Sequence, residues 1–373
     1  MTRAKKNETV QEYYSLDPIL KKDSVYNIIF GERSNGKTYA VLNYALKNYF
    51  AGKGKFAILR RYGMDITASK IKTFFAPFFT GNENLIEKYS CGLYDRIVTR
   101  SGYFYLAKYD ETLDKIITEN DYIGVALSLA DVEHFKSTSY PEITTIFFDE
   151  FISRTGYLQD EFILFMNVLS TIIRERKNVK IFMCGNTVNK YNPYFEEMGL
   201  KNATRMAQGT IDVYSYANSA LTTAVEYCGN IQKASNVYFA FDNPKLNMIT
   251  GGIWELDIYP HIPTNYTRND VILTFYVEFK QHILSCDVVQ TETDLFIYCH
   301  RKTTPIKDRD SEIVYSLIRD SNPLHFQIMS SKDTRKVNRK IVELINNKKL
   351  FFQNNDIGDI FFNYLKECQN IGI

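Results

Sequence analysis

The sequence predicts an α/β fold in which helices cover a largely parallel sheet, followed by a second region of α+β character. Three apolar runs carry this prediction, at residues 25–30, 144–148 and 179–184. Each run is followed by small or polar residues, as is typical of buried parallel strands that end at a turn. Because the carboxyl ends of such strands meet at one edge of the sheet, we expect functional side chains there.

Composition and charge narrow the classes of function. The chain has 373 residues, enough for two domains, and its 45% hydrophobic and 24% charged residues match an ordinary globular protein. The net charge of +2 excludes a uniformly basic, histone-like DNA-binding protein but permits a local basic face. The six cysteines form no C-x-x-C pair and no window of about 18 residues is apolar, so we expect reduced thiols and no membrane partner.

The first apolar run leads directly into Gly31–Thr38, which has the pattern G-x-x-x-x-G-K-T, and a helical pattern follows at residues 39–46. A strand, this loop and a helix in that order are the context of a phosphate-binding P-loop. Backbone N–H groups would bind phosphate oxygens, Lys37 would reach the β- and γ-phosphates, and the Thr38 hydroxyl would ligate Mg²⁺. The predicted ATP-binding residues are Gly31, Ser34, Asn35, Gly36, Lys37 and Thr38. The alternative is a Gly-rich turn before a helix.

Residues 56–59 predict the next strand, which ends at Arg60 and Arg61. These arginines lie either at the ligand-binding edge of the sheet or in a solvated turn, and the sequence leaves both interpretations open. Further along, residues 103–107 and 122–128 predict strands that add to the parallel sheet in antiparallel orientation.

The second apolar run ends in Asp149 and Glu150, the arrangement known as Walker B. We expect its carboxyl end beside the P-loop, where Asp149 would hold Mg²⁺ together with Thr38 and Glu150 would polarise the attacking water. Two acids that merely cap a strand end are the alternative. Because this pair follows a P-loop in an α/β pattern, the catalytic interpretation is favoured.

Residues 160–174 show helical spacing, and the helix ends near Arg174 and Arg176. Cations near a helix C-terminus interact favourably with the helix dipole, so a structural role stays open. The alternative is an arginine finger that reaches the γ-phosphate held by a neighbouring subunit. The third apolar run is followed by Gly185 and Asn186. Asn186 is either a γ-phosphate sensor that also contacts the attacking water or an ordinary turn residue.

The second half of the chain has a different character. Small and polar residues at 217–250 predict a connecting stretch. Three strand-like runs then predict an antiparallel meander, at 270–279, 282–289 and 294–300. A helical tail follows, and its basic run 332–349 is either a nucleic-acid contact or a solvated helix face. We predict a nucleotide-binding domain at 1–228, a linker or small connecting subdomain at 229–258 and a C-terminal α+β domain at 259–373.

With Gly31–Thr38, Asp149-Glu150, Arg174 and Gly185-Asn186 in this order, the chain resembles the DNA-packaging (encapsidation) ATPases of phi29-group tailed phages, which are related to terminase large-subunit motors. Further stretches that carry the resemblance are Leu59-Arg60-Arg61-Tyr62, residues 147–152, Arg174-Glu175-Arg176 and Asn192-Pro193-Tyr194-Phe195. The motifs cover residues 25–200, and the tail is similar only in length and strand pattern.

The resemblance implies an additional-strand P-loop ATPase of the packaging-terminase type, joined to a C-terminal domain that resembles a vestigial RNase H-like nuclease. It also implies a ring of subunits, usually five, at the portal of a prohead in the host cytoplasm, with or without a scaffold RNA. Hydrolysis of ATP, with Mg²⁺ as cofactor, would drive double-stranded DNA into the prohead. By position, Glu150 is the base and Arg174, rather than Arg176, is the arginine supplied in trans.

Larger terminases cleave DNA with a nuclease domain, whose chemistry needs three or four carboxylates around two metal ions. The candidate acids in this chain are Glu278, Asp287, Glu292 and Asp294, which we expect mostly in turns. The resemblance therefore implies a C-terminal domain that does not cleave DNA.

Two other functions fit the P-loop less well. A different P-loop enzyme, such as a helicase or a nucleotide kinase, would show further helicase motifs or a lid with clustered arginines, and the sequence has neither pattern. A nucleotide-gated scaffold that binds ATP without hydrolysis would have no use for a water-polarising acid at Glu150.

Overall fold

The chain divides into two compact units, Met1–Glu255 and Leu256–Ile373, and each is described by itself. The computed structural model describes residues 13–80, 83–132, 138–154, 156–217, 219–228, 254, 259–262, 264–327, 329 and 335–371. The predicted linker, residues 229–258, therefore lies outside the described residues except for Trp254.

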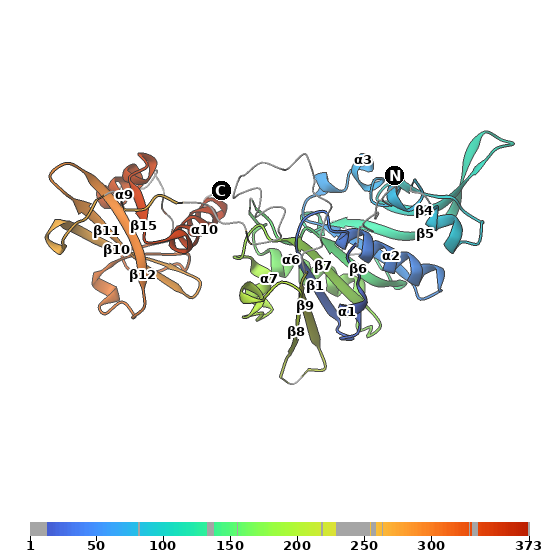
Figure 1. Cartoon of the computed structure of the whole chain (residues 1–373), viewed down its shortest axis with the longest axis horizontal. Coiled ribbons are helices and arrows are strands. Elements are labelled where there is room, and N and C mark those ends of the chain that lie inside the picture. Colours follow the sequence, from blue (N-terminus) through green and yellow to red (C-terminus); the bar gives the residue numbers. More distant parts are fainter. Residues whose placement is uncertain are drawn as a thin grey trace, which may run out of the picture. The chain divides into compact units, whose positions relative to one another are not determined.

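A nine-stranded sheet forms the first unit, with the strand order β3-β4-β5-β2-β6-β7-β1-β9-β8 (Figure 1). The strands are β1 (Tyr26–Gly31), β2 (Lys55–Arg60), β3 (Arg96–Arg100), β4 (Tyr103–Asp110), β5 (Lys115–Ser128), β6 (Ile143–Asp149), β7 (Lys180–Asn186), β8 (Thr210–Ser215) and β9 (Thr222–Tyr227). Six strands that are neighbours in the sheet, β5-β2-β6-β7-β1-β9, run parallel to one another. The predicted antiparallel addition is confirmed for residues 103–107, since β4 pairs antiparallel with both β3 and β5. It is wrong for residues 122–128, which end β5 and pair in parallel with β2.

Strand β9 corrects the interpretation of residues 217–250 as a connecting stretch. Thr222–Tyr227 pairs in parallel with β1, the strand that leads into the P-loop, and β8 continues the sheet beyond it. Its mixed sequence, with two threonines and Glu226, carries no clear apolar period, although most of the strand is buried. This segment is a core strand because it lies between β1 and β8 and is covered on both faces of the sheet. Local sequence does not reveal such burial.

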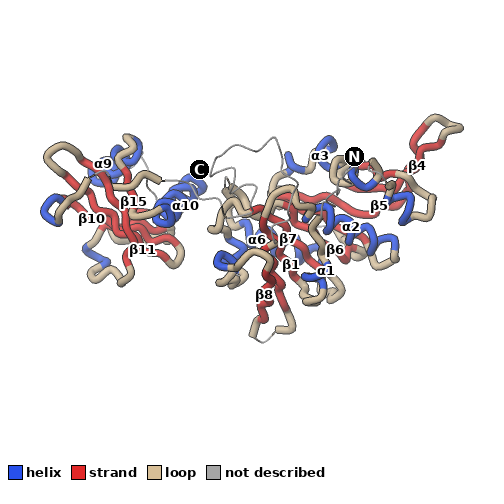
Figure 2. The backbone as a smooth tube through the Cα atoms, viewed as in Figure 1, coloured by secondary structure: helices blue, strands red, loops and turns tan. Residues whose placement is uncertain are grey.

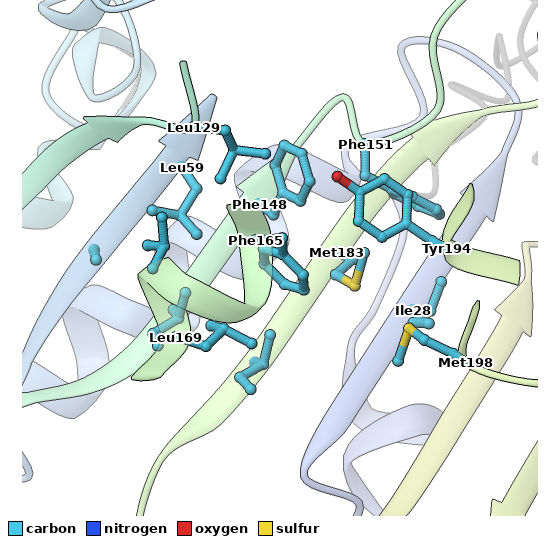
Figure 3. Packing of buried hydrophobic residues seen from close by; sticks show 14 of the residues in the cluster. Ile28, Leu59, Leu129, Phe148, Phe151, Phe165, Leu169, Met183, Tyr194 and Met198 are labelled. Atoms are coloured by element: carbon cyan, nitrogen blue, oxygen red, sulfur yellow. The ribbon is translucent and has the colours of Figure 1, made fainter. Parts of the chain in front are cut away.

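Helices cover both faces of this sheet, and the order of side chains along β6 shows why. The helices are α1 (Asp17–Leu20), α2 (Lys37–Phe50), α3 (Ala68–Ile71), α4 (Leu85–Tyr89), α6 (Glu161–Ile173) and α7 (Pro193–Glu197). Successive side chains of a strand point to opposite faces, so Phe147 joins the hydrophobic cluster that includes α2, whereas Phe148 joins the cluster that includes α6. Figure 3 shows Phe148 of β6 packed near Phe165 of α6, and Figure 2 shows the strands between the helices.

Trp254, the only tryptophan of the chain, is buried in the first unit. Its ring centroid lies 5.3 Å from that of Phe30, the residue before the first glycine of the P-loop. Phe195 and Tyr227 surround it at 6.2 and 6.4 Å. The end of β1 is thus packed among aromatic rings.

The second unit contains a six-stranded sheet with the order β14-β13-β10-β11-β12-β15. Its elements are β10 (Val271–Phe279), β11 (His282–Gln290), β12 (Leu295–Lys302), β13 (Ile313–Ser316), β14 (His325–Phe326), α9 (Lys336–Asn346), β15 (Leu350–Phe352) and α10 (Asn355–Ile371). The predicted antiparallel meander is confirmed as β10, β11 and β12. Strand β13 pairs in parallel with β10, β14 with β13, and β15 with β12.

Two expectations about the second unit are wrong. The helix expected over the basic run 332–349 ends at Asn346, and the chain forms β15 before the last helix, α10. Glu278 and Asp287 lie within strands β10 and β11 rather than in turns. Among the described residues of the whole chain, no helix has the length and apolar character that a membrane crossing requires.

Candidate nucleotide-binding and hydrolysis site

The P-loop connects β1 to α2, and three of its residues have a positive φ angle. Gly31, Ser34 and Gly36 have φ angles of 146°, 57° and 94°, and Gly36 is the N-cap of α2. Glycine is required at the first position for a second reason, because a Cβ on Gly31 would lie 3.1 Å from the Cβ of Cys228. The resulting curl ends at a helix N-terminus, where backbone N–H groups and the helix dipole favour an anion.

Lys37 lies buried at the centre of this loop. Its Nζ donates to the carbonyl oxygen of Glu32, to Oδ1 of Asn35 at 3.1 Å and to Oδ1 of Asn186 at 3.5 Å. Burial lowers the pKa of Lys37, and the negative charge of Asp149 opposes that shift. The structure thus brings together Asn35, Lys37 and Asn186, which come from the loop, α2 and the end of β7.

Thr38 and Asp149 meet across the sheet edge. The Thr38 hydroxyl donates to Oδ1 of Asp149 at 3.2 Å. Asp149 ends β6, which pairs with β7, so Asp149 stands beside Cys184, two residues before Asn186. Burial raises the pKa of the Asp149 carboxyl, while the Arg60 guanidinium and the Thr38 hydroxyl counteract the rise.

Arg60 resolves one of the alternatives left open by the sequence. Its guanidinium pairs with Oδ2 of Asp149 at 3.0 Å and with Oε2 of Glu150 at 2.7 Å. This contact follows from the register, since Leu59 of β2 pairs with Phe148 of β6 and the next residues emerge together at the sheet edge. The Glu150 side chain remains 62% exposed, whereas Arg60 is mostly buried. Arg60 is a site residue, and the neighbouring Arg61 is not, because Arg61 is buried in an ion pair with Glu161.

The helix-end arginines lie away from this edge. Arg176 donates to the carbonyl oxygen of Ile143 at 2.6 Å, and Ile143 is the first residue of β6 whereas Asp149 is the last. Arg174 is the C-cap of α6, is exposed and forms no ion pair with a described residue. Within one chain, therefore, Arg174 is not brought to the P-loop, and Arg176 ties the end of α6 to the sheet.

A cavity of about 1160 Å³ opens above the P-loop. The predicted residues Ser34, Asn35, Gly36, Lys37, Thr38, Asp149, Glu150 and Asn186 all line it. Tyr14, which also lines it, fixes the N-terminal segment on the loop: its N–H donates to the Asn35 carbonyl at 3.0 Å, and its hydroxyl donates to Glu226 at 2.7 Å. Burial raises the pKa of Glu226. Glu226 could not be predicted as a partner of this segment, because the weak pattern of β9 gives no signal for it.

The residues present fit a nucleotide with Mg²⁺. Thr38 and Asp149 offer hydroxyl and carboxylate oxygens, which this hard cation prefers. The described residues contain no cluster of three or more His, Cys, Asp or Glu side chains suited to a metal. Such a cluster is not required, because Mg²⁺ in nucleotide sites is usually held by one or two protein groups, water and the phosphates themselves.

Sequence comparisons place this geometry in a family context. The family model for the podovirus DNA encapsidation protein (Gp16) matches residues 113–369. The DNA packaging protein of Bacillus phage phi29 is 26% identical over 189 residues, which are 49% of this chain and 49% of that protein. The DNA packaging protein of Bacillus phage B103 is 29% identical over 188 residues, or 49% of this chain and 50% of that protein. The matched region thus spans about half the length of these relatives.

Solved structures share the fold. The bacteriophage Phi-29 viral genome packaging motor assembly is 20% identical, with 95% of this chain and 99% of that chain covered and a TM-score of 0.58. The Phi-28 gp11 DNA packaging motor is 18% identical, with 96% and 99% covered and a TM-score of 0.53. The resemblance to the encapsidation proteins is confirmed, and, because the family model matches well over half of its residues, this chain belongs to the podovirus DNA encapsidation protein (Gp16) family.

Proposed function

We propose that this protein is the ATP-hydrolysing subunit of a motor that moves double-stranded DNA into a preformed phage prohead. The observation that carries the proposal is the convergence of Lys37, Thr38, Asp149 and Glu150 on one cavity, in a chain of the encapsidation family. The P-loop alone would support nucleotide binding, whereas the acid that follows β6 supports hydrolysis.

The predicted site residues that line the cavity would each have a defined role in hydrolysis. The loop amides and Lys37 bind the phosphates, and Asn186 orients the γ-phosphate and the attacking water. Thr38 and Asp149 would hold Mg²⁺, which neutralises charge on the phosphate oxygens when bound. The exposed Glu150 carboxylate takes the proton of the attacking water.

Arg174 supports the oligomeric part of the proposal. It is exposed, and it lies two residues before Arg176, which bonds to the first residue of β6, so it is remote from the P-loop of its own chain and is available to the site of another subunit. We propose that Arg174 completes the neighbouring site in a homo-oligomeric ring, five subunits being the number implied by the resemblance. The ring would act at the prohead portal in the host cytoplasm, and a scaffold RNA is a further partner to be tested.

The second unit fits a relic of a nuclease. A meander of three antiparallel strands followed by two strands parallel to its first member is the order of the RNase H fold, which supports our assignment of that fold to the unit. Three of its candidate acids have partners within the unit, because Glu278 pairs with Arg309, Asp294 with Lys349, and Asp287 with His300. We therefore propose that this unit does not cleave DNA. The exposed basic side chains of α9, namely Lys336, Arg339 and Lys340, are candidates for nucleic-acid contact.

The test is phosphate release measured against protein concentration, with and without double-stranded DNA. We expect Glu150→Gln to lower the turnover rate about 10²- to 10⁴-fold, because general-base catalysis is lost while the P-loop is kept. Glu197→Gln, an exposed acid on α7, is the matched control and should keep the wild-type rate. Equal rates for wild type and Glu150→Gln would instead favour the scaffold that binds ATP without hydrolysis. Stimulation by single-stranded DNA alone would favour a helicase-like motor.

A further inference from the structure

Arg61 and Glu161 form a buried ion pair behind the acids of the cavity. Nε of Arg61 lies 2.7 Å from Oε2 of Glu161 and Nη2 lies 3.0 Å from Oε1, so the contact is bidentate. The Glu161 side chain is fully buried and that of Arg61 is 8% exposed. Although burial acts to lower it, the pKa of Arg61 is raised by the hydrogen bonds that the guanidinium donates to Glu161 and by the charge of that carboxylate. The desolvation of two charges offsets most of the attraction within a buried ion pair, so stability alone does not explain why this pair lies beside Glu150.

The same guanidinium holds the backbone at Glu150. Nη1 of Arg61 donates to the Glu150 carbonyl at 3.2 Å, and Nη2 donates to the Phe151 carbonyl at 2.8 Å. Glu150 has a φ of 58°, a left-handed conformation that residues with a Cβ adopt rarely and that persists only where the surroundings enforce it. Arg61 therefore fixes the turn from which the Glu150 carboxylate projects.

Glu161 is in turn fixed by other elements. Its Oε1 accepts a hydrogen bond from the Tyr194 hydroxyl at 2.6 Å, and its Oε2 accepts one from the N–H of Leu158 at 2.8 Å. The Arg61 guanidinium also lies over the ring of Tyr157, 5.0 Å from its centroid. The network thus joins the ends of β2 and β6 to the starts of α6 and α7. Arg61 and Glu161 at its centre each bond to further groups besides one another.

We propose that Arg61 is a positioning residue for hydrolysis, which acts through the backbone of Glu150. This inference rests on the proposed function. Glu150 lines the cavity, whereas Arg61 is not among its lining residues, so Arg61 does not touch the nucleotide. A displacement of the base by about 1 Å would be enough to lower the rate about 10²-fold, since the reaction depends on near-attack geometry.

The principal test is Arg61→Lys. Lysine keeps the positive charge beside Glu161 but has a single nitrogen, which cannot bond the carboxylate and both carbonyls as the planar guanidinium does. We expect kcat to fall about 30- to 100-fold while the KM for ATP stays unchanged, because the P-loop is untouched. Hydrogen exchange in the peptide that covers residues 150–153 should become faster.

Lys55→Gln is the matched control. Lys55 begins β2, whereas Arg61 follows its last residue, and Lys55 is also buried between two acids, Asp121 at 2.7 Å and Glu142 at 2.6 Å. We expect this variant to lose a comparable amount of thermal stability but to keep the wild-type kcat and the wild-type exchange at residues 150–153. A merely structural Arg61 would make the two variants behave alike.

Tyr194→Phe serves if Arg61→Lys does not fold, because it removes only one donor to Glu161. We expect kcat to fall about two- to fivefold at constant KM, with faster exchange at residues 150–153. Wild-type kcat together with wild-type exchange in either variant would overturn the positioning role. Glu150→Gln separates this outcome from a failure of the proposed function. If Glu150→Gln matches wild type, the hydrolysis proposal fails, and exchange at residues 150–153 still tests whether Arg61 fixes the backbone at Glu150.

Discussion

The two sheets of the molecule use carboxylates in opposite ways. In the first sheet, Asp149 and Glu150 share one cation, Arg60, and both line an open cavity together with the Thr38 hydroxyl. In the second unit, Asp287 and Asp294 each have a basic partner of their own, whereas Glu278 shares Arg309 with Asp320. Two acids with one cation leave negative charge for a metal and a proton, whereas one acid per cation, as at Asp287 and Asp294, leaves none.

Position in the strand explains this difference. Asp149 is the last residue of the parallel strand β6 and Glu150 follows it, at the edge where ligands bind. Asp287 lies within an antiparallel strand, where cross-strand neighbours are close, and Thr274 on β10 and His300 on β12 bond it. A carboxylate at the end of a parallel strand, such as Asp149, is thus available to a ligand. A carboxylate within an antiparallel strand, such as Asp287, is instead bound by side chains of the neighbouring strands.

The largest effect should come from removing the arginine that we propose completes the first site in trans. We expect Arg174→Ala to bind ATP normally and to lose about 10³-fold or more of its steady-state hydrolysis, because the transition-state charge is no longer stabilised. Nucleotide affinity and phosphate release are the measurements. Lys177→Ala, an exposed cation on the same turn, should keep both wild-type values.

Mixing experiments separate action in trans from a structural role. Arg174→Ala mixed with Glu150→Gln should recover activity, since some interfaces then contain one intact arginine and one intact base. Equal activity of wild type and Arg174→Ala in dilute, monomeric protein is consistent with this scheme. A large defect of the monomeric variant would contradict it.

A smaller effect should follow when the shared cation is removed. We expect Arg60→Ala to lower kcat about 10²-fold, because the two acids then repel one another and lose their common anchor. Arg60 lowers the pKa of Asp149 against burial, so its loss should raise that pKa and move the acid limb of the kcat–pH profile to higher pH. Arg100→Ala, at the end of β3, is the control. An unshifted acid limb would show that Arg60 does not set the charge of Asp149.

The smallest effect concerns the second sheet. Hydrogen bonds from His300 and Thr274 lower the pKa of Asp287 below 3.8, so its stabilisation is present above that pH and is lost as the pH falls. The Asp287 carboxylate raises the pKa of His300 above 6.5, so its stabilisation is present below 6.5 and is lost as the pH rises through the folded pKa. The pair is therefore fully formed between about pH 4 and 6.5.

Asp287→Asn should lower the opening free energy of β11 by about 1 kcal/mol in that window and leave ATP hydrolysis unchanged. Hydrogen exchange of β11 at several pH values measures the first effect. Asp294→Asn, which removes a partly exposed pair with Lys349, should change the exchange of β11 less than Asp287→Asn does. A loss of ATP hydrolysis in Asp287→Asn would mean that the two sheets do not divide their carboxylates as described.

Local sequence predicts those parts of the site in which strand, loop and helix follow one another. The P-loop residues from Ser34 to Thr38, the acids at the end of β6 and Asn186 at the end of β7 all belong to this class, and all line the same cavity. Arg60 and Arg61 could not be distinguished, because adjacent residues leave a strand on opposite sides and only the tertiary structure shows which side is the cavity. Strands β13, β14 and β15 escaped prediction because two to four residues are too few to show a period.

The position of Trp254 gives the molecule a built-in optical probe. Its indole packs on Phe30, next to the loop that would receive the phosphates, and no second tryptophan contributes to the emission. Tryptophan emission, excited selectively over the 27 tyrosines, therefore follows the end of β1. Binding at the P-loop and unfolding of the first unit can be recorded on the unlabelled wild-type protein, without any added chromophore.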